Sequence, residues 1–261
     1  MVDAANQPQR GIDAIVGART LLGRRGIGAG CTGWRPPATR FDGAVQAYVL
    51  PGDLSSDGTE VTFAAMFRSI HDGSSAQCIV GHGVAGGVGQ ISAVIAQTTG
   101  RVEVLIVDAD GATTRYFARW ATNVLDGAWH HVCGSFDLAA PAGRAYLDGV
   151  APDLAESAAS AGTFDWTTTQ GILIGGDNFA RWLEGDVGNV LMADVYVDLS
   201  VAANLAKLLD PATGLMVDVG AAGELLTGEQ PLVYLPDITG GNLGSAGAFI
   251  KVGTPFQVPG P

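Results

Sequence analysis

Hydrophobic and polar residues alternate along short stretches of the chain, and glycine and aspartate separate these stretches. The clearest alternation lies in residues 101–107, RVEVLIV, where Val102, Val104 and Ile106 fall on one face. Other stretches of strand length follow one another between residues 41 and 198: AVQAYVL, EVTFAAMFRS, QCIVG, QISAVIAQ, TTRYFARW, WHHVCGSF, RAYLDG, GILIGG and DVGNVLMADVYV. Short strands at this spacing are typical of an antiparallel sandwich or barrel.

Only one segment has a helical pattern. Residues 200–210, SVAANLAKLLD, combine alanine and leucine with Ser200 as the expected N-cap, and Pro211 ends the segment. We therefore predict an all-β fold, an antiparallel two-sheet β-sandwich with one short helix.

The composition agrees with a globular sandwich. The chain has 261 residues, of which 47% are hydrophobic and 15% charged, enough to bury a full core in one main domain. No apolar run is long enough to span a bilayer, so we expect no membrane insertion. The amino terminus, MVDAANQPQR, lacks the apolar core of a secretory signal, so we expect synthesis in the cytoplasm without a signal peptide.

Charge divides the chain unevenly. Residues 1–40 contain six arginines and two aspartates, a net charge of +4, which leaves −16 for the rest of a chain whose total is −12. An acidic body repels nucleic acid, so we expect no nucleic-acid partner. We predict three parts: a basic and irregular N-terminal arm, residues 1–40; a sandwich domain, residues 41–214; and a C-terminal extension, residues 215–261, that closes or flanks the sandwich. The arm is a candidate anchor on an acidic neighbour through Arg10, Arg19, Arg24 and Arg25.

Several motifs occur in a familiar order: FDGAVQAYVL, VTFAAMFRS, DGAWHHVCGSFD, GRAYLDGV, GILIGGD and WLEGDVGNVLMADVYV. Together they resemble a laminin-G-like domain, a concanavalin-A-like jelly roll, over residues 41–210. The resemblance implies the jelly-roll form of the sandwich. It does not imply one function, because this fold occurs in lectins, glycosidases and inert scaffolds.

The end of the chain, residues 231–260, resembles the tail that follows such domains in structural proteins of tailed phages, with its Asn-x-Gly-x-x-Gly-x-Phe stretch. The leading hypothesis is a non-enzymatic virion structural protein: a capsid decoration, fibre or tail component. It would be located in the virion, contact other virion proteins through its arm, and form homo-oligomers through its jelly roll. The alternative is a lectin-like carbohydrate-binding module that recognises a host surface glycan.

The adjacent residues His130 and His131 raise the question of a metal or catalytic site. In a strand they point to opposite faces, with Trp129, His131 and Cys133 on one face and His130 on the other, so they cannot share one metal. We therefore expect both imidazoles to pack within a sheet. The three cysteines, Cys31, Cys78 and Cys133, have no paired spacing and favour neither disulfides nor zinc.

Two acids, Glu184 and Asp186, lie two apart as in glucanases of this fold, but the third acidic position is held by Asn189 or Val190. A retaining glycosidase needs two carboxyl groups about 5 Å apart, so a glycosidase is only the third hypothesis and we predict no catalytic residue. The GAGCTG stretch, residues 28–33, fits a dinucleotide motif, but the prolines that follow exclude the required helix.

Two further groups of residues have candidate roles. Asp148, Asp177 and Asn178 lie in expected turns and offer the hard oxygen ligands of calcium, although turns favour the same residues for backbone reasons. We predict no cofactor, with calcium as the alternative. Trp166 and Trp182 lie near turns and are candidate contacts for a glycan or a neighbouring subunit.

Overall fold

The computed structural model describes residues 37–261 except 53, 55–56, 83–90, 97, 110–111, 167–170, 178–179 and 238–240. Residues 34–261 belong to one compact unit. The arginines proposed for the arm, Arg10, Arg19, Arg24 and Arg25, and the GAGCTG stretch lie outside the described residues.

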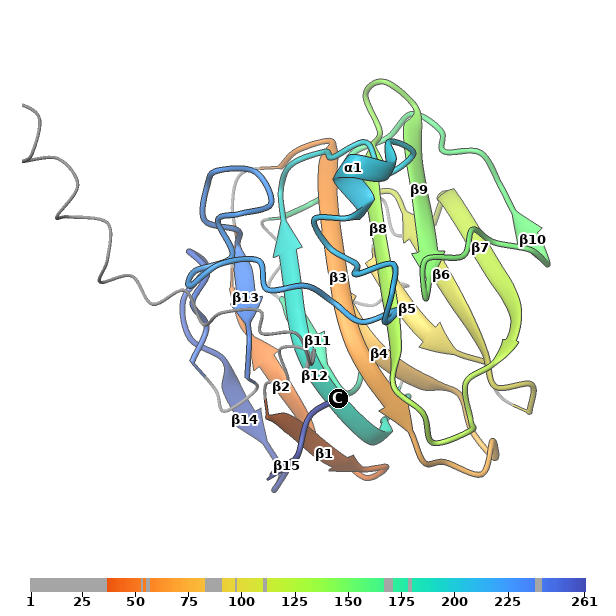
Figure 1. Ribbon diagram of the computed structural model, residues 1–261, viewed down its shortest axis with the longest axis vertical. Helices are drawn as coiled ribbons and strands as arrows, with labels where there is room; N and C mark the ends of the chain where they lie inside the picture. The colour runs from red at the N-terminus through yellow and green to blue at the C-terminus, as the bar shows by residue number, and fades with distance from the viewer. Residues whose placement is uncertain are drawn as a thin grey trace, which may run out of the picture. The chain divides into compact units, whose positions relative to one another are not determined.

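Within the described residues, the strands form two antiparallel sheets (Figure 1). The first sheet has the order β15 (Phe256–Val258), β1 (Ala38–Asp42), β12 (Glu184–Ala193), β3 (Glu60–Ser69), β8 (His130–Asp137) and β9 (Ala142–Leu147), and β13 (Val233–Leu235) also pairs with β12. The second sheet has the order β10 (Ala155–Glu156), β7 (Thr114–Asn123), β6 (Arg101–Val107), β5 (Ile91–Ile95), β4 (Gln77–His82), β11 (Ile172–Ile174), β2 (Ala47–Leu50) and β14 (Ile250–Val252). The predicted all-β, two-sheet sandwich is confirmed.

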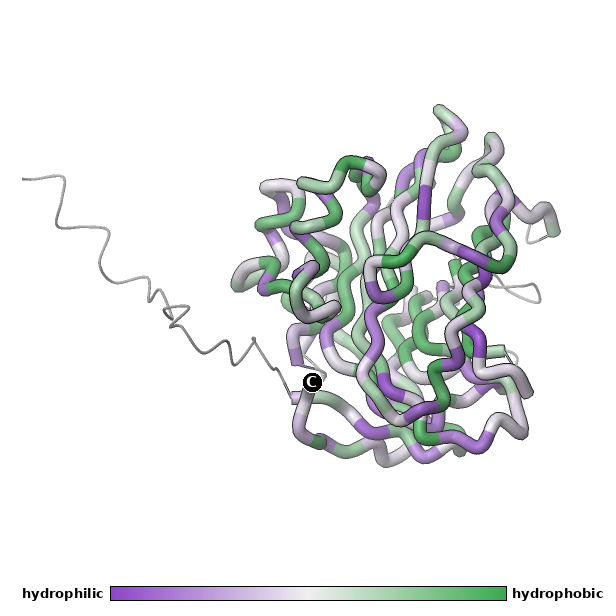
Figure 2. The backbone as a smooth tube through the Cα atoms, turned by 45° about the vertical axis from the view of Figure 1, so that its right-hand side comes forward, coloured by the Kyte–Doolittle hydropathy of each residue, from purple (hydrophilic) through white to green (hydrophobic). Residues whose placement is uncertain are grey.

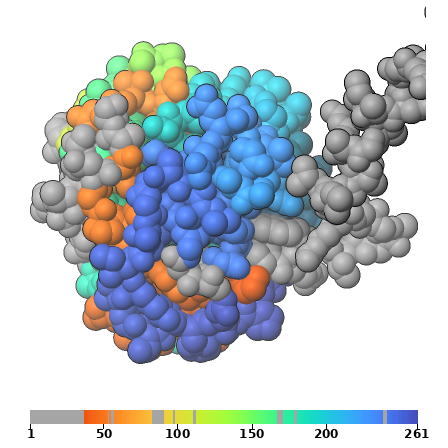
Figure 3. Space-filling view, turned by 90° about the vertical axis from the view of Figure 1, so that its left-hand side faces the viewer, coloured from red at the N-terminus to blue at the C-terminus, as the bar shows by residue number. Residues whose placement is uncertain are grey.

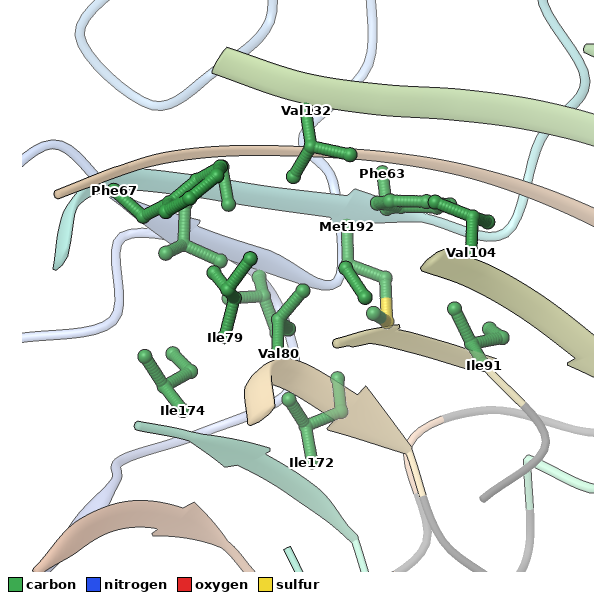
Figure 4. Packing of buried hydrophobic residues seen from close by; sticks show 14 of the residues in the cluster. Phe63, Phe67, Ile79, Val80, Ile91, Val104, Val132, Ile172, Ile174 and Met192 are labelled. Carbon is green, nitrogen blue, oxygen red and sulfur yellow. The ribbon is translucent and has the colours of Figure 1, made fainter. Parts of the chain in front are cut away.

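The main core lies between the two sheets. In β6, Val102, Val104 and Ile106 are fully buried while Arg101 and Glu103 are partly exposed, as the alternating pattern predicts. Figure 2 shows the same alternation of hydrophobic and hydrophilic residues along the backbone of many strands. Figure 4 shows aromatic and branched side chains of both sheets filling this space, among them Phe63, Phe67, Val132, Val80, Ile172 and Ile174. Each such side chain stabilises the fold by about 1.5–3 kcal/mol through burial.

A second, smaller hydrophobic layer covers part of the outer face of the first sheet, the face turned away from the second sheet. The segment that follows β12 contains α1 (Ala202–Leu205), which lies in front of the upper ends of β3 and β8 in Figure 1. Apolar residues of this segment pack on outer-face residues of β3, β8 and β12: Leu199, Leu208, Met216, Val219 and Leu226 on Ala64, Met66, Cys133 and Leu191. The lower half of the outer face bears the charged residues Arg40, Asp186 and Arg68. The C-terminal end of the chain lies in front of β12 on this half of the face (Figure 1).

The helix expected over residues 200–210 is shorter than predicted, and Ser200 is not its N-cap. The N-cap is Val201, which makes no side-chain cap hydrogen bond. The Ser200 backbone N–H and hydroxyl both donate to Asp198 Oδ1, so the aspartate forms a local turn that competes with an earlier helix start. Among the described helices, none is both long and apolar enough to cross a bilayer.

The C-terminal segment forms one edge of each sheet. β14 pairs with β2 of the second sheet, and β15 pairs with β1 of the first. Figure 3 shows the C-terminal residues beside residues of the first strands on this side of the molecule.

The Asn-x-Gly motif in this segment has a local structural role. Asn242 Oδ1 accepts hydrogen bonds from the N–H groups of Tyr234 (2.9 Å) and Gly244 (2.9 Å), and its Nδ2 donates to Leu232 O (3.1 Å). A Cβ atom at Gly244 would lie 2.4 Å from Leu232 O, so only glycine fits there. The hydrogen bonds of Asn242 therefore hold this part of the C-terminal segment against β13.

Candidate functional site

The two adjacent histidines have different surroundings. His131 pairs with Met66 on the outer face of the first sheet, is fully buried, and has no hydrogen-bond partner on either ring nitrogen. His130 Nδ1 lies 2.7 Å from Asp148 Oδ2, and its Nε2 lies 3.1 Å from Asp126 Oδ1. The prediction that the two imidazoles point apart is confirmed. Within the described part of the chain, no three His, Cys, Asp or Glu side chains gather closely enough to hold a metal ion.

Their protonation also differs. Burial lowers the pKa of His131 to about 4, so its imidazole is neutral at neutral pH. Burial also lowers the pKa of His130, but the hydrogen bonds and negative charges of Asp148 and Asp126 outweigh it and leave that pKa raised. His130 therefore ties the β8–β9 hairpin to the loop before β8.

The aspartates considered for calcium are engaged with protein donors. Asp148 adopts a positive φ of 52°, and besides contacting His130 it accepts a hydrogen bond from His131 N at 2.8 Å. Asp177 accepts hydrogen bonds from Arg181 Nε and from Arg181 N (3.2 Å). Asp148 follows β9 of the first sheet and Asp177 follows β11 of the second, while Asn178 lies outside the described residues. Turn formation and ion pairing account for both described aspartates.

The expectation that Trp166 is exposed is wrong. Its side chain is fully buried, with its ring 5.0 Å from His82 and 5.7 Å from Phe164. Trp166 lies near a turn in the sequence, but its large apolar ring is buried because the end of the sandwich core accommodates it. Trp182 is half-buried over Gly176, where a Cβ would lie 2.3 Å from Trp182 Cε3.

The two glucanase-like acids share the outer face of β12 but differ in their environment. The Glu184 side chain is 40% exposed, and its Oε2 lies 3.9 Å from His71 Nε2. Asp186 is fully buried, and both of its oxygens accept hydrogen bonds from guanidinium groups. Asp186 is therefore a structural anion and not a free acid or base.

Strand register lines up five side chains across the outer face. Arg40 lies opposite Asp186, and Asp186 lies opposite Arg68. Phe256 lies opposite Arg40, and the pairing of Phe67 with His130 puts Trp129 beside Arg68. Since directly opposite residues share a face, these strands, adjacent in the lower part of Figure 1, carry one cross-strand row: Phe256, Arg40, Asp186, Arg68 and Trp129.

Asp186 holds both arginines of the cross-strand row. It accepts hydrogen bonds from Arg40 Nε and Nη2 (2.9 Å) and from Arg68 Nε (2.8 Å) and Nη2. The two arginine side chains are 25% and 27% exposed. The hydrogen bond to Asp186 raises the pKa of Arg40, although burial opposes it. Among the described residues, the Nη1 atoms of Arg40 and Arg68 have no hydrogen-bond partner, so each guanidinium group can still donate a hydrogen bond to another molecule.

Aromatic side chains lie at both ends of the cross-strand row. The Arg68 guanidinium stacks 5.2 Å from the centre of the half-buried Trp129 ring. A Cβ at Gly188 would lie 3.6 Å from Trp129 Cζ3 and 3.8 Å from Pro261 Cδ, so the Trp129 ring and the buried Pro261 both lie over this glycine. Phe256 is 56% exposed on the edge strand. Next to it runs an open groove of about 550 Å³, lined by Pro37, Gln257, Val258, Pro259 and Gly260.

Carboxylates adjoin the cross-strand row. Asp42 lies two residues from Arg40, and Glu184 two residues from Asp186, so both share the outer face. Asp42 is exposed. The surface thus combines fixed cationic donors, carboxylate acceptors and two aromatic rings. Sequence reasoning missed Arg40, Arg68 and Phe256, because only the pairing of distant strands brings them together.

Comparisons with known proteins agree on the fold. The family model of the concanavalin A-like lectin/glucanases superfamily matches residues 42–197. A search of curated protein sequences finds no match. The chain is similar to the native heptameric SAP-like pentraxin of Limulus polyphemus, with a TM-score of 0.56 and 11% identity over 87% of this chain and 96% of that one. It is also similar to a candidate carbohydrate binding protein of Bacteroides ovatus ATCC 8483, with a TM-score of 0.60 and 17% identity over 87% of this chain and 62% of that one.

Proposed function

Since the chain belongs to the concanavalin A-like lectin/glucanase superfamily, we propose that it is a non-catalytic carbohydrate-binding protein and that the cross-strand row is its binding surface. The observation that carries the proposal is the row itself, in which a buried carboxylate fixes two guanidinium groups between the exposed Phe256 ring and the half-buried Trp129 ring. The similar fold of the Bacteroides ovatus protein supports it further.

The chemistry of the surface suits a sugar. Sugar hydroxyls both donate and accept hydrogen bonds, so they match the free Nη1 donors of Arg40 and Arg68 and the carboxylate acceptors of Asp42 and Glu184. Aromatic rings offer flat apolar faces to sugar C–H groups. Phe256 is 56% exposed, and Trp129, which carries the Arg68 guanidinium, is half-buried. Because Asp186 already holds both guanidiniums, little side-chain freedom is lost on binding.

The same geometry argues against hydrolysis. A glycosidase of this fold needs two carboxyl groups that are free to exchange protons with, or attack, the sugar. Asp186 is occupied by four hydrogen bonds from arginine nitrogens, so Glu184 and Asp186 do not form the pair of free acids that the glucanase-like spacing suggests. We therefore propose a binding role without catalysis.

A glycan array followed by calorimetry tests the proposal. We expect the protein to bind at least one glycan and Trp129→Ala to abolish that binding, while Phe117→Ala, a partly exposed aromatic change on β7 of the other sheet, leaves it unchanged. Circular dichroism verifies that both variants fold. Absence of glycan binding by the unmodified protein, or equal binding by the Trp129→Ala variant, would contradict the proposal.

A second proposal concerns where this binding takes place. The tail resemblance of residues 231–260 and the arginine-rich arm favour a virion structural protein that assembles with other virion proteins and with copies of itself, and that recognises a host glycan. We expect deletion of residues 1–34 to leave a folded jelly roll that no longer enters particles. Mass spectrometry of purified particles tests this, and normal incorporation of the truncated protein would refute the anchoring role of Arg10, Arg19, Arg24 and Arg25.

A further inference from the structure

We propose that Pro259, Gly260 and Pro261 form a strap beside the cross-strand row, and that a saccharide displaces this strap when it binds to Trp129. This inference rests on the proposed carbohydrate-binding function and goes further, because it identifies a segment of the chain itself that controls access to the binding surface.

The position of the strap is the first argument. A Cβ atom at Gly188 would lie 3.6 Å from Trp129 Cζ3 and 3.8 Å from Pro261 Cδ, so the two rings meet above this glycine of β12. Pro261 is buried and Trp129 is half-buried. Figure 1 shows the C-terminal end of the chain in front of β12. The proline ring therefore takes up space next to the indole that a stacked sugar ring needs.

The strap reaches this position in an extended conformation. The pairing of β15 with β1 ends at Val258, opposite Ala38, while Pro261 lies over β12, two strands from β15. Two strand spacings are about 9.6 Å, and three extended residues span about 9–10 Å, so the strap crosses β1 without slack. Ala38 shares the outer face with Arg40. It is only 1% exposed, as expected for a residue beneath the strap.

Weak attachment is the second argument. Among the described residues, none donates a hydrogen bond to the strap or accepts one from it. Burial of the Pro261 ring stabilises the closed position, but fixing a segment that contains Gly260 costs conformational entropy. An open groove of about 550 Å³ runs along residues 257–260, so the strap has room to lift without moving a strand. A ligand can therefore displace it at low cost.

Competition between strap and ligand has a measurable consequence. The apparent dissociation constant equals the intrinsic constant divided by the fraction of molecules in which the strap is open. If the strap is closed in about two-thirds of the molecules, its removal raises the affinity about threefold. In return, a bound saccharide shifts the strap toward the open state, in which Pro261 is mobile.

Calorimetry with cellohexaose, maltohexaose, laminarihexaose, mannohexaose and xylohexaose tests the competition. The unmodified protein is compared with a variant that lacks residues 259–261 and with Pro261→Gly, which removes only the ring. We expect both variants to bind at least one of these saccharides at least about threefold more tightly than the unmodified protein. The matched control is Pro141→Gly, the same change at an exposed proline between β8 and β9, which should leave the affinity unchanged. Circular dichroism verifies that all variants fold.

A second measurement follows the strap directly. In protein with ¹³C-labelled proline, the Pro261 signal, assigned through Pro261→Gly, should narrow when the saccharide saturates the protein. An unchanged line width in the saturated complex, or equal or weaker binding by the two strap variants, would overturn the inference. The proposed function would still stand, provided that the unmodified protein binds and Trp129→Ala abolishes the binding. If no saccharide of the panel binds to any form of the protein, both fail.

Discussion

Replacing the buried anion of the cross-strand row is the sharpest test of its architecture. In the Asp186→Asn variant the side chain keeps its shape but loses its charge, and the new amide group directs N–H donors toward guanidinium N–H donors. Asp186 is fully buried, and it accepts four hydrogen bonds from two arginines. The change therefore leaves Arg40 and Arg68 side by side without a counter-ion.

The magnitude follows from burial. Removing one partner of a buried ion pair costs about 3–5 kcal/mol. The arginine side chains are 25% and 27% exposed, so water can solvate part of the released charge. We therefore expect the lower end, a loss of about 3 kcal/mol in the free energy of unfolding. With a urea dependence of about 3 kcal/mol/M, the unfolding midpoint falls by about 1 M.

Urea unfolding monitored by tryptophan fluorescence measures this loss, with Asp194→Asn as the matched control. Asp194 is exposed just after β12, and its substitution should change stability by less than about 0.5 kcal/mol. A loss for Asp186→Asn no larger than that of the control would refute the account of Asp186 as the anion that holds the row together.

A triple variant separates stability from binding. The combination of Arg40→Met, Asp186→Leu and Arg68→Met replaces the ionic cluster by apolar side chains, and such replacements are often neutral for stability or stabilising. We expect its free energy of unfolding to lie within about 1 kcal/mol of the unmodified protein, and its glycan binding to be lost. Retained binding would exclude the arginines from the site.

Three further changes test other parts of the fold. Burial lowers the pKa of both His82 and His131 to about 4, whereas the pKa of histidine in the unfolded chain is near 6.5. Between these two values the unfolded chain binds more protons than the folded protein. The free energy of unfolding is therefore highest above about pH 6.5 and falls by up to about 3 kcal/mol per histidine as the pH decreases to 4. Urea midpoints across this range measure the effect, and a flat profile would contradict the burial of these neutral imidazoles. His131→Leu should raise stability at pH 7 by about 1 kcal/mol, because it removes two buried nitrogens that lack partners; a loss above about 2 kcal/mol would mean that the imidazole has a bonding role. Asn242→Ala should cost about 2 kcal/mol through three lost hydrogen bonds, with faster amide exchange at Tyr234 as the local readout, and unchanged exchange would show that the tail does not depend on this side chain.

The sequence predicts those features of the fold that depend on local patterns. Alternation along 101–107 gives the buried face of β6, and the same period gives the opposite directions of His130 and His131. Local reasoning fails where tertiary contacts decide. Trp166 stands between Asp165 and a run of polar residues, yet it is buried because the core has room for its ring. Ser200 is not the N-cap because its N–H donates to Asp198.

The cross-strand row lies beyond such local reasoning. Arg40 and Asp186 are 146 residues apart in the chain, and Arg68 and Asp186 are 118 apart. No pattern within one strand indicates which residue of another strand lies opposite it, because the register of a pair is fixed by the whole sheet. A one-residue shift of β12 would turn Asp186 toward the core and Val187 toward the arginines.

A β-bulge explains how one sheet face serves two purposes. The pairing of β12 with β3 shifts between Val187 and Val190, both of which face the core between the sheets. Two residues, Gly188 and Asn189, thus occupy the space that one residue takes in a regular strand. On the far side of this bulge, Leu191 packs under the layer that follows β12.

On the near side, Asp186 and Glu184 share the outer face with polar partners, and no described element of that layer packs on them. A regular strand without the bulge would reverse the alternation on one side of it and would bury either Leu191 or Asp186 against the wrong neighbours. The extra residue lets an apolar half and a polar half of the same strand both face outward. It is therefore the bulge that permits one outer face to carry a structural layer at one end and, at the other, the ionic and aromatic surface from which carbohydrate binding is inferred.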